Sequence, residues 1–282
     1  MALLNNIRLF RPHQWIKNLM IYFPAFLGGE LLTSGVLSRG VAPFIAFCCA
    51  SSSIYIFNDI IDIQQDRAHP VKKNRPLPAG TVAVPVAGGV SCLLLLTAAL
   101  LGSLVSTSFL LLLLAYLAVS WSYSLWLKHH PLFDIFCIAS GFLFRLLAGG
   151  EAFRIAVSEW LFLSVFLLAI FLSTGKRLGE KGYLGRHAGA HRKALDTYPD
   201  GFLDGTMYMT GGAVLVTYTL YVIAHQRLVY TVPLCCFGLL RYILRVKSGR
   251  EGDPTESLLK DPVLFLVGVA WAAATAWGLY GR

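Results

Sequence analysis

Nine apolar segments, each about as long as a membrane-spanning helix, recur along this chain and limit what it can fold into. A transmembrane helix needs about 20 mostly apolar residues. Only 14% of the 282 residues are charged, against about 25% in soluble domains. The sequence therefore predicts an all-α integral membrane protein in which one domain, residues 1–282, is a nine-helix bundle. The candidate spans are roughly residues 18–37, 41–60, 82–104, 108–127, 132–150, 156–174, 207–224, 228–246 and 263–280.

The first segment is the weakest candidate, because Pro24, Gly28, Gly29 and Glu30 interrupt it. We still count it as a candidate span, and the charge pattern decides the orientation of the bundle. Lys and Arg accumulate in cytoplasmic loops of membrane proteins. With the N-terminus in the cytoplasm, most of the 24 Lys and Arg residues fall in cytoplasmic segments. This orientation places the C-terminus outside and both long loops, about 64–81 and 175–206, inside the cell.

The net charge of +9 is then explained by topology, so nucleic-acid binding is not expected. The six cysteines all lie within apolar runs and lack the spacing of zinc ligands. They predict small buried side chains rather than disulfides.

Acidic residues gather where the second apolar segment ends. The stretch reads Asn58-Asp59-Ile-Ile-Asp62-Ile-Gln-Gln-Asp66. If the helix continues through it, the three acids fall on one face and repel each other unless a cation neutralises them. Oxygen ligands at this density suit Mg²⁺, which usually shares its coordination with substrate phosphates. The plainer alternative is a solvated helix end.

Basic residues follow the acids at once, in the order Arg67, Lys72, Lys73 and Arg75. Clustered Lys and Arg side chains recognise phosphate. Acids and cations together predict a site for a Mg-diphosphate at the cytoplasmic face. Acidic residues beside a membrane span are rare and usually functional.

The loop after the sixth span is a second charged region. It begins Gly175-Lys176-Arg177-Leu-Gly-Glu180 and contains His191-Arg192-Lys193-Ala-Leu-Asp196-Thr-Tyr198-Pro-Asp200. Residues 190–198 look helical, and Pro199-Asp200-Gly201 should end that helix. Its mixture of cations and acids favours a polyphosphate site over a loop that only sets topology. The last cytoplasmic loop, about 247–262, is either a cap over the site or a plain connector.

A diphosphate bonded to carbon departs when Mg²⁺ and basic side chains neutralise its charge. We see no nucleophile with an adjacent base, so a covalent enzyme intermediate is not expected. The expected mechanism is ionisation to a carbocation-like centre, followed by capture by an acceptor.

The nine predicted spans and the motif Asn58-Asp59-x-x-Asp62-x-x-x-Asp66 resemble the UbiA superfamily of membrane prenyltransferases. Those enzymes bind a Mg-isoprenyl diphosphate between two Asp-rich loops of an all-helical bundle. Three further stretches are similar to a branch that transfers 5-phosphoribose from phosphoribosyl diphosphate to a polyprenyl phosphate, in bacterial cell-wall biogenesis. They are Arg11-Pro12-His-Gln14-Trp15-Ile-Lys17-Asn18, Asp66-x-x-His69-Pro70-x-Lys72-x-x-Arg75-Pro76 and Gly175-Lys176-Arg177-x-x-Glu180 with His191-Arg192-Lys193-x-Leu-x-x-Tyr198.

This resemblance implies site roles. The metal ligands would be Asn58, Asp59, Asp62 and Asp66, the three acids also being catalytic. The substrate-binding residues would be Lys17, Asn18, Lys72, Arg75, Lys176, Arg177, Arg192 and Tyr198. A second phosphate on the donor would account for the additional cations. The expected partners are Mg²⁺, phosphoribosyl diphosphate, a polyprenyl (decaprenyl) phosphate and the lipids of a bacterial plasma membrane, with a homo-oligomer left open.

Two alternatives stay open. A prenyltransferase that moves an isoprenyl chain to an aromatic or other small acceptor would use Asp196-x-x-x-Asp200 as a second metal motif, although Pro199 disturbs its register. A transporter could use the acids for cation coupling, but transporters usually place such acids near the bilayer midplane. Mg²⁺-dependent release of diphosphate would distinguish both enzymes from the transporter.

Overall fold

The structure, a computed structural model, describes residues 8–68, 71–184, 193–224, 228–250 and 252–281, and every regular element in these ranges is helical. Eight stretches of the described chain are long and apolar enough to cross a membrane. Their helices are α4 (Val41–Ile61), α6 (Val84–Val105), α7 (Thr107–Leu125), α8 (Phe133–Phe153), α9 (Glu159–Leu184), α12 (Phe202–Ala224), α13 (Val232–Lys247) and α15 (Pro262–Tyr280).

Shorter helices join the long ones at both ends of the bundle. They are η1 (Pro12–Tyr22), α2 (Phe23–Leu27), α3 (Val36–Arg39), α5 (Ile63–Ala68), η2 (Lys72–Asn74), η3 (Leu127–His129), α11 (Lys193–Thr197), η5 (Val229–Thr231) and α14 (Pro254–Lys260).

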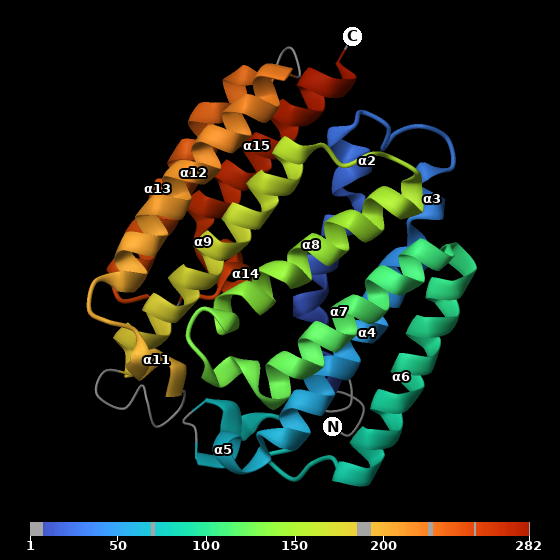
Figure 1. Cartoon of the computed structure of the whole chain (residues 1–282), viewed down its shortest axis with the longest axis vertical. Coiled ribbons are helices and arrows are strands. Elements are labelled where there is room, and N and C mark those ends of the chain that lie inside the picture. The colour runs from blue at the N-terminus through green and yellow to red at the C-terminus, as the bar shows by residue number, and fades with distance from the viewer. Residues whose placement is uncertain (1–7, 69–70, 185–192, 225–227, 251, 282) are drawn as a thin grey trace.

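The segment predicted as the first span, 18–37, is the one that differs from expectation. It consists of the end of η1, the short helix α2 and a turn, so it is not one long helix. The turn that follows needs glycine, because Gly29 and Gly35 adopt φ of 74° and 81°, which side chains disfavour. Figure 1 shows the dark-blue segment passing α8 and reaching α2, at the end of the bundle away from α5.

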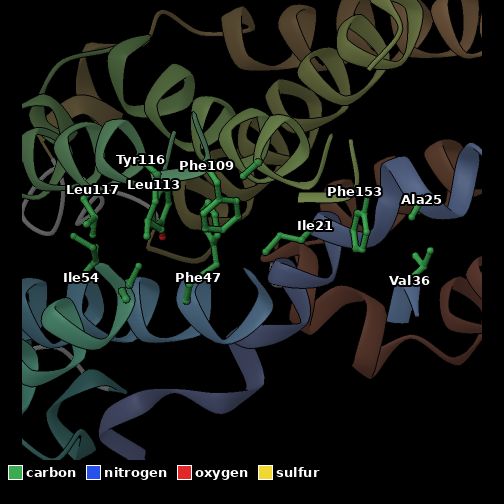
Figure 2. Close-up of a cluster of buried hydrophobic side chains, with 14 residues drawn as sticks. Ile21, Ala25, Val36, Phe47, Ile54, Phe109, Leu113, Tyr116, Leu117 and Phe153 are labelled. Atoms are coloured by element: carbon green, nitrogen blue, oxygen red, sulfur yellow. The ribbon is translucent and has the colours of Figure 1, made fainter. Parts of the chain in front are cut away.

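The N-terminal segment packs tightly against the long helices. Figure 2 shows Ile21 beside a row of side chains that includes Phe47 of α4 and Phe109 of α7. The rings of Phe47 and Phe109 meet edge to face at 5.8 Å. A Cβ added at Gly149 of α8 would lie 2.1 Å from the carbonyl oxygen of Ile21. Glycine at this position therefore lets α8 touch the backbone of η1, as small residues do between membrane helices.

The arrangement of the ends positions the site. In Figure 1, α5 and α11 lie at one end of the bundle, and α2, α3 and the C-terminus lie at the other. We call the first the α5/α11 end. The C-terminal ends of α4 and α9 both lie there, so the acids after α4 and the cations of α9 come to the same side of the molecule.

Helix α9 is longer than predicted. We expected a loop from residue 175, but the helix continues to Leu184. Lys, Arg, Leu and Glu favour helix, and Arg177 pairs with Glu180 one turn later. The predicted helix over 190–198 is confirmed where it is described, as α11, and it stops before Pro199.

Candidate active site

A cavity of about 290 Å³ lies between the N-terminal segment and helices α4, α7, α8 and α9, and the segment before α14 closes one side of it. Its wall combines charged groups with aromatic and aliphatic side chains. The charged and amide residues that line it are Arg11, Lys17, Asn58, Asp62, Lys72, Arg75, Arg145, Lys176, Arg177, Glu180 and Asp253.

The predicted acidic motif forms the α4 side of this cavity. Helix α4 ends at Ile61 and α5 begins at Ile63, with Asp62 between them at φ −90° and ψ 9°. The predicted continuous helix is thus interrupted at Asp62. The side-chain amide of Asn58 donates to Asp62 Oδ2 at 3.0 Å, and both residues line the cavity.

Basic side chains already neutralise the other two acids. Arg75 Nη1 lies 3.0 Å from Asp59 Oδ1 and 2.6 Å from Asp66 Oδ2, so one guanidinium holds both carboxylates. Arg11 also pairs with Asp59, and Lys72 Nζ lies 3.8 Å from Asp66 Oδ1. Asp59 and Asp66 are buried, and neither lines the cavity. They therefore fix Arg11, Arg75 and Lys72 at its edge.

Lys128, from the turn between α7 and α8, neutralises Asp62. Its Nζ lies 2.6 Å from Oδ1 and 2.8 Å from Oδ2 of that carboxylate. Sequence patterns alone do not assign this residue to the site, because 66 residues separate the two partners.

The four-residue metal set predicted from the sequence is not assembled as a cluster. Among the described residues, no group of three or more His, Cys, Asp or Glu side chains is arranged to hold a metal ion. Arg11, Arg75 and Lys72 pair with Asp59 and Asp66, and Lys128 pairs with Asp62. The donor atoms on the cavity wall still suit Mg²⁺. Asp62 offers a carboxylate and Asn58 an amide oxygen, and Mg²⁺ typically takes one or two carboxylates plus substrate phosphates.

The α9 side of the cavity carries a lysine and an acid from distant parts of the sequence. Lys176 Nζ lies 2.9 Å from Asp253 Oδ2. A Cβ on Gly252 would lie 2.3 Å from the carbonyl oxygen of Gly175, so two glycines let the chain before α14 press against α9. This contact brings Asp253 beside Lys176. Of the two roles left open for the last loop, the cap is the one that the structure supports.

The pKa of Asp253 lies well below its ordinary value. Burial acts to raise it, but the positive charges of Lys176 and Lys17 lower it, as do a hydrogen bond from Lys176 and one from the backbone N–H of Glu256. Asp253 also caps α14, accepting that Glu256 N–H at 3.3 Å. It is therefore a fixed negative charge.

Lys17 lines the same cavity from η1. Burial lowers its pKa to about 8, with help from the charges of Lys176, Arg145 and Arg11 and with opposition from Asp253. Within the described residues Lys17 forms no ion pair, so its ammonium group is available to bind an anionic ligand.

Arg177 and Tyr198, both predicted to bind substrate, belong instead to a buried network. Arg177 Nε lies 2.7 Å from Asp134 Oδ2, and Arg177 also pairs with Glu180. The hydroxyl of Tyr198 donates to Asp134 Oδ1 at 2.6 Å and accepts the N–H of Leu132 at 2.7 Å. Arg177 touches the cavity wall, whereas Tyr198 does not.

The substrate-binding prediction for Arg192 falls outside the described residues. Asp196 and Asp200, the alternative second metal motif, are both exposed, and Asp200 pairs with Lys181 at 3.2 Å. The structure therefore does not bring this motif to the acids of α4.

Asn18, another predicted substrate ligand, is fully buried and binds Arg145 instead. The Nε of Arg145 donates to Asn18 Oδ1 at 2.7 Å. Arg145 was visible in the sequence only as a charge within a predicted span, which is itself a signal of function. Three residues of the site were not predicted from the sequence. Arg145 and Asp253 line the cavity, and Lys128 pairs with Asp62, which lines it.

A family model described as the UbiA prenyltransferase family matches residues 21–269 of the chain. Among curated proteins, the decaprenyl-phosphate phosphoribosyltransferase of Mycolicibacterium smegmatis is 32% identical, over 97% of this chain and 92% of that protein. The protein of the same name from Mycobacterium tuberculosis is 33% identical, over 96% of this chain and 94% of its own length.

Solved structures share the fold at lower identity. A UbiA homolog from Archaeoglobus fulgidus bound to GPP and Mg²⁺ superposes with a TM-score of 0.77 at 20% identity, covering 97% of this chain and 98% of that one. A digeranylgeranylglyceryl phosphate synthase superposes with a TM-score of 0.68 at 16% identity, covering 100% and 99%. Both likenesses concern the fold of the whole chain.

Proposed function

Since the chain belongs to the UbiA prenyltransferase family, we propose that it transfers 5-phosphoribose from phosphoribosyl diphosphate to a polyprenyl phosphate and releases diphosphate. The full-length relatives named decaprenyl-phosphate phosphoribosyltransferase support this choice, and they suggest decaprenyl phosphate as the acceptor.

The observation that carries the choice of donor is the second charged wall. Lys17, Lys176 and Asp253 line the cavity from η1, α9 and the segment before α14, whereas Asn58 and Asp62 line it from the end of α4. An isoprenyl chain would need an apolar surface there, because buried charges facing hydrocarbon are costly. A donor with a sugar and a second phosphate suits this wall: phosphate can pair with the lysines, and the carboxylate can accept from a ribose hydroxyl.

Mg²⁺ would be held by Asn58 and Asp62, the two oxygen donors of the α4 wall, and when bound it would neutralise the departing diphosphate. Asp59 and Asp66 act in this proposal chiefly through Arg11, Arg75 and Lys72, which they hold at the cavity edge. Those three cations bind the diphosphate oxygens and stabilise the charge that develops as the bond to the sugar breaks.

The reaction exchanges one bond at the anomeric carbon of ribose. The bond from that carbon to the diphosphate oxygen breaks, and its electron pair leaves with the diphosphate. An oxygen of the polyprenyl phosphate supplies the pair for the new bond. Both reactants carry negative charge, so the excess of Lys and Arg around the cavity lowers the repulsion between them.

We further propose that residues 18–37 make a ninth crossing in two short helices, which places the N-terminus in the cytoplasm and the C-terminus outside. The α5/α11 end would then face the cytoplasm of a bacterial plasma membrane, where soluble diphosphates are found. The basic residues that follow α4, namely Arg67, Lys72, Lys73 and Arg75, lie at that end, in keeping with the distribution of positive charge in membrane proteins.

A transfer assay tests the proposal. Detergent-purified protein is incubated with Mg²⁺, polyprenyl phosphate and phosphoribosyl diphosphate labelled in the ribose. Label should move into the lipid phase, and EDTA should stop the transfer. If label stays in the aqueous phase while an isoprenyl diphosphate is consumed with a small aromatic acceptor, the chain is a prenyltransferase of the same fold.

A further inference from the structure

Arg145 places a positive charge deep within the bundle. It lies twelve residues into α8, counted from Phe133 at the α5/α11 end, which corresponds to about 18 Å along the helix axis. Its side chain is 5% exposed, and it lines the cavity. The Nη1 atom reaches back one turn to the carbonyl oxygen of Gly141, 2.7 Å away, so the guanidinium points toward the acids of α4.

All the hydrogen-bond partners of this guanidinium are neutral. Besides the Gly141 carbonyl, they are Asn18 Oδ1 at 2.7 Å from Nε and the Tyr116 hydroxyl at 3.0 Å from Nη2. The guanidinium also stacks on the Tyr116 ring, 4.6 Å from its centroid. A guanidinium has five N–H groups, so these bonds leave two donors over. Within the described chain, no carboxylate forms an ion pair with Arg145.

A charge in this position has an unfavourable free energy unless an anion binds beside it. Arginine stays protonated in proteins, and an uncompensated charge in a membrane interior is strongly unfavourable. Lys17, the neighbour of Asn18 in the chain, is a second cation without an ion pair, whereas Lys176 is paired with Asp253. The cavity wall thus carries two positive charges, Lys17 and Arg145, that form no ion pair with a described carboxylate, and two such charges are the complement of a phosphate dianion.

On the basis of the proposed function, we propose that Arg145 and Lys17 bind the 5-phosphate of the donor. Arg145 then orients the donor with its diphosphate toward Asn58 and Asp62. It also discriminates against donors that lack a second anionic group. Three neutral hydrogen bonds and the Tyr116 ring hold the guanidinium in place before the donor arrives. The isoprenyl tail of a prenyl diphosphate would leave both charges unmatched, so Arg145 selects the class of donor.

The test compares two donors with the same leaving group, phosphoribosyl diphosphate and ribosyl 1-diphosphate, which lacks the 5-phosphate. Arg145→Gln should lower kcat/KM for the first donor about 100-fold, corresponding to loss of a charge-assisted interaction, and leave kcat/KM for the second nearly unchanged. Arg145→Lys should restore part of the preference. Arg154→Gln, at an exposed arginine just beyond α8, is the matched control and should behave as wild type.

Three outcomes would overturn the inference. An equal loss with both donors means that Arg145 only supports Asn18 and Tyr116. A raised KM for polyprenyl phosphate with an unchanged donor preference means that Arg145 binds the acceptor. A Lys17→Met variant that keeps the wild-type preference would also contradict the inference, and this variant serves if Arg145→Gln fails to fold.

Calorimetric binding of ribose 5-phosphate separates this inference from the proposed function. Binding by wild type that is lost in Arg145→Gln would support the phosphate site even if no transfer to lipid were found, in which case the proposed function alone would fail. Equal binding by both proteins would overturn the inference whether or not transfer occurs.

Discussion

Lys17 should make kcat/KM for phosphoribosyl diphosphate depend strongly on pH. Burial lowers the pKa of Lys17 to about 8 from an ordinary value of 10.5. Only the protonated amine pairs with phosphate, so the favourable charge is present below pH 8 and is lost as the pH rises through 8. A group with that pKa is about 90% charged at pH 7 and about 10% charged at pH 9, which predicts a loss of nearly tenfold in productive free enzyme.

The assay is the pH profile of kcat/KM for phosphoribosyl diphosphate, because this ratio reports the pKa values of the free enzyme. Above pH 7 the donor phosphate is already a dianion, since its second pKa is about 6. Wild type should show a single downward inflection near pH 8. Lys17→Arg keeps the charge and should flatten the profile from pH 7 to 9. A flat wild-type profile, or the same inflection in Lys17→Arg, would show that the charge of Lys17 does not control donor binding.

The other predictions concern the α4 wall, the α9 wall and the packing. Asp62→Asn should lower Mg²⁺-dependent turnover about 100-fold and leave Lys128 without its counter-ion, whereas the exposed control Asp200→Asn should be unaffected; equal turnover of the two variants would remove Asp62 from the site. Lys176→Ala should raise the KM for phosphoribosyl diphosphate about tenfold, and an unchanged KM would exclude a role in donor binding. Gly149→Ala should cost about 1–3 kcal/mol of stability by overpacking, whereas Gly212→Ala, where an added Cβ meets nothing within 4 Å, should cost none; similar thermal midpoints in detergent would contradict the close contact between α8 and η1.

Local patterns in the sequence predicted most of the long helices and the common location of the acids after α4. Apolar length identified eight of the spans, and the acids after α4 are adjacent in the sequence, so their common location follows from one helix end. The first predicted span is the exception, because Gly29 and Gly35 allow a turn that hydropathy alone does not register.

Pairings between distant residues could not be predicted. Lys176 meets Asp253 across 77 residues, and Arg145 meets Asn18 across 127; no periodicity links such positions. Tyr198 has an internal partner that the sequence did not indicate. Its place in a charged loop suggested substrate contact, but Asp134 lies 64 residues away and binds its hydroxyl. Several of the predicted cations line the cavity, but their internal partners could be identified only from the fold.

The most direct test of the account is a structure of the protein with phosphoribosyl diphosphate and Mn²⁺ in place of Mg²⁺, with the metal located by its anomalous scattering. We expect Mn²⁺ beside Asn58 and Asp62, with the 5-phosphate within hydrogen-bond distance of Lys17 and Arg145. A metal bound elsewhere, or a donor whose 5-phosphate lies beside Asp62 and whose diphosphate lies beside Arg145, would contradict it.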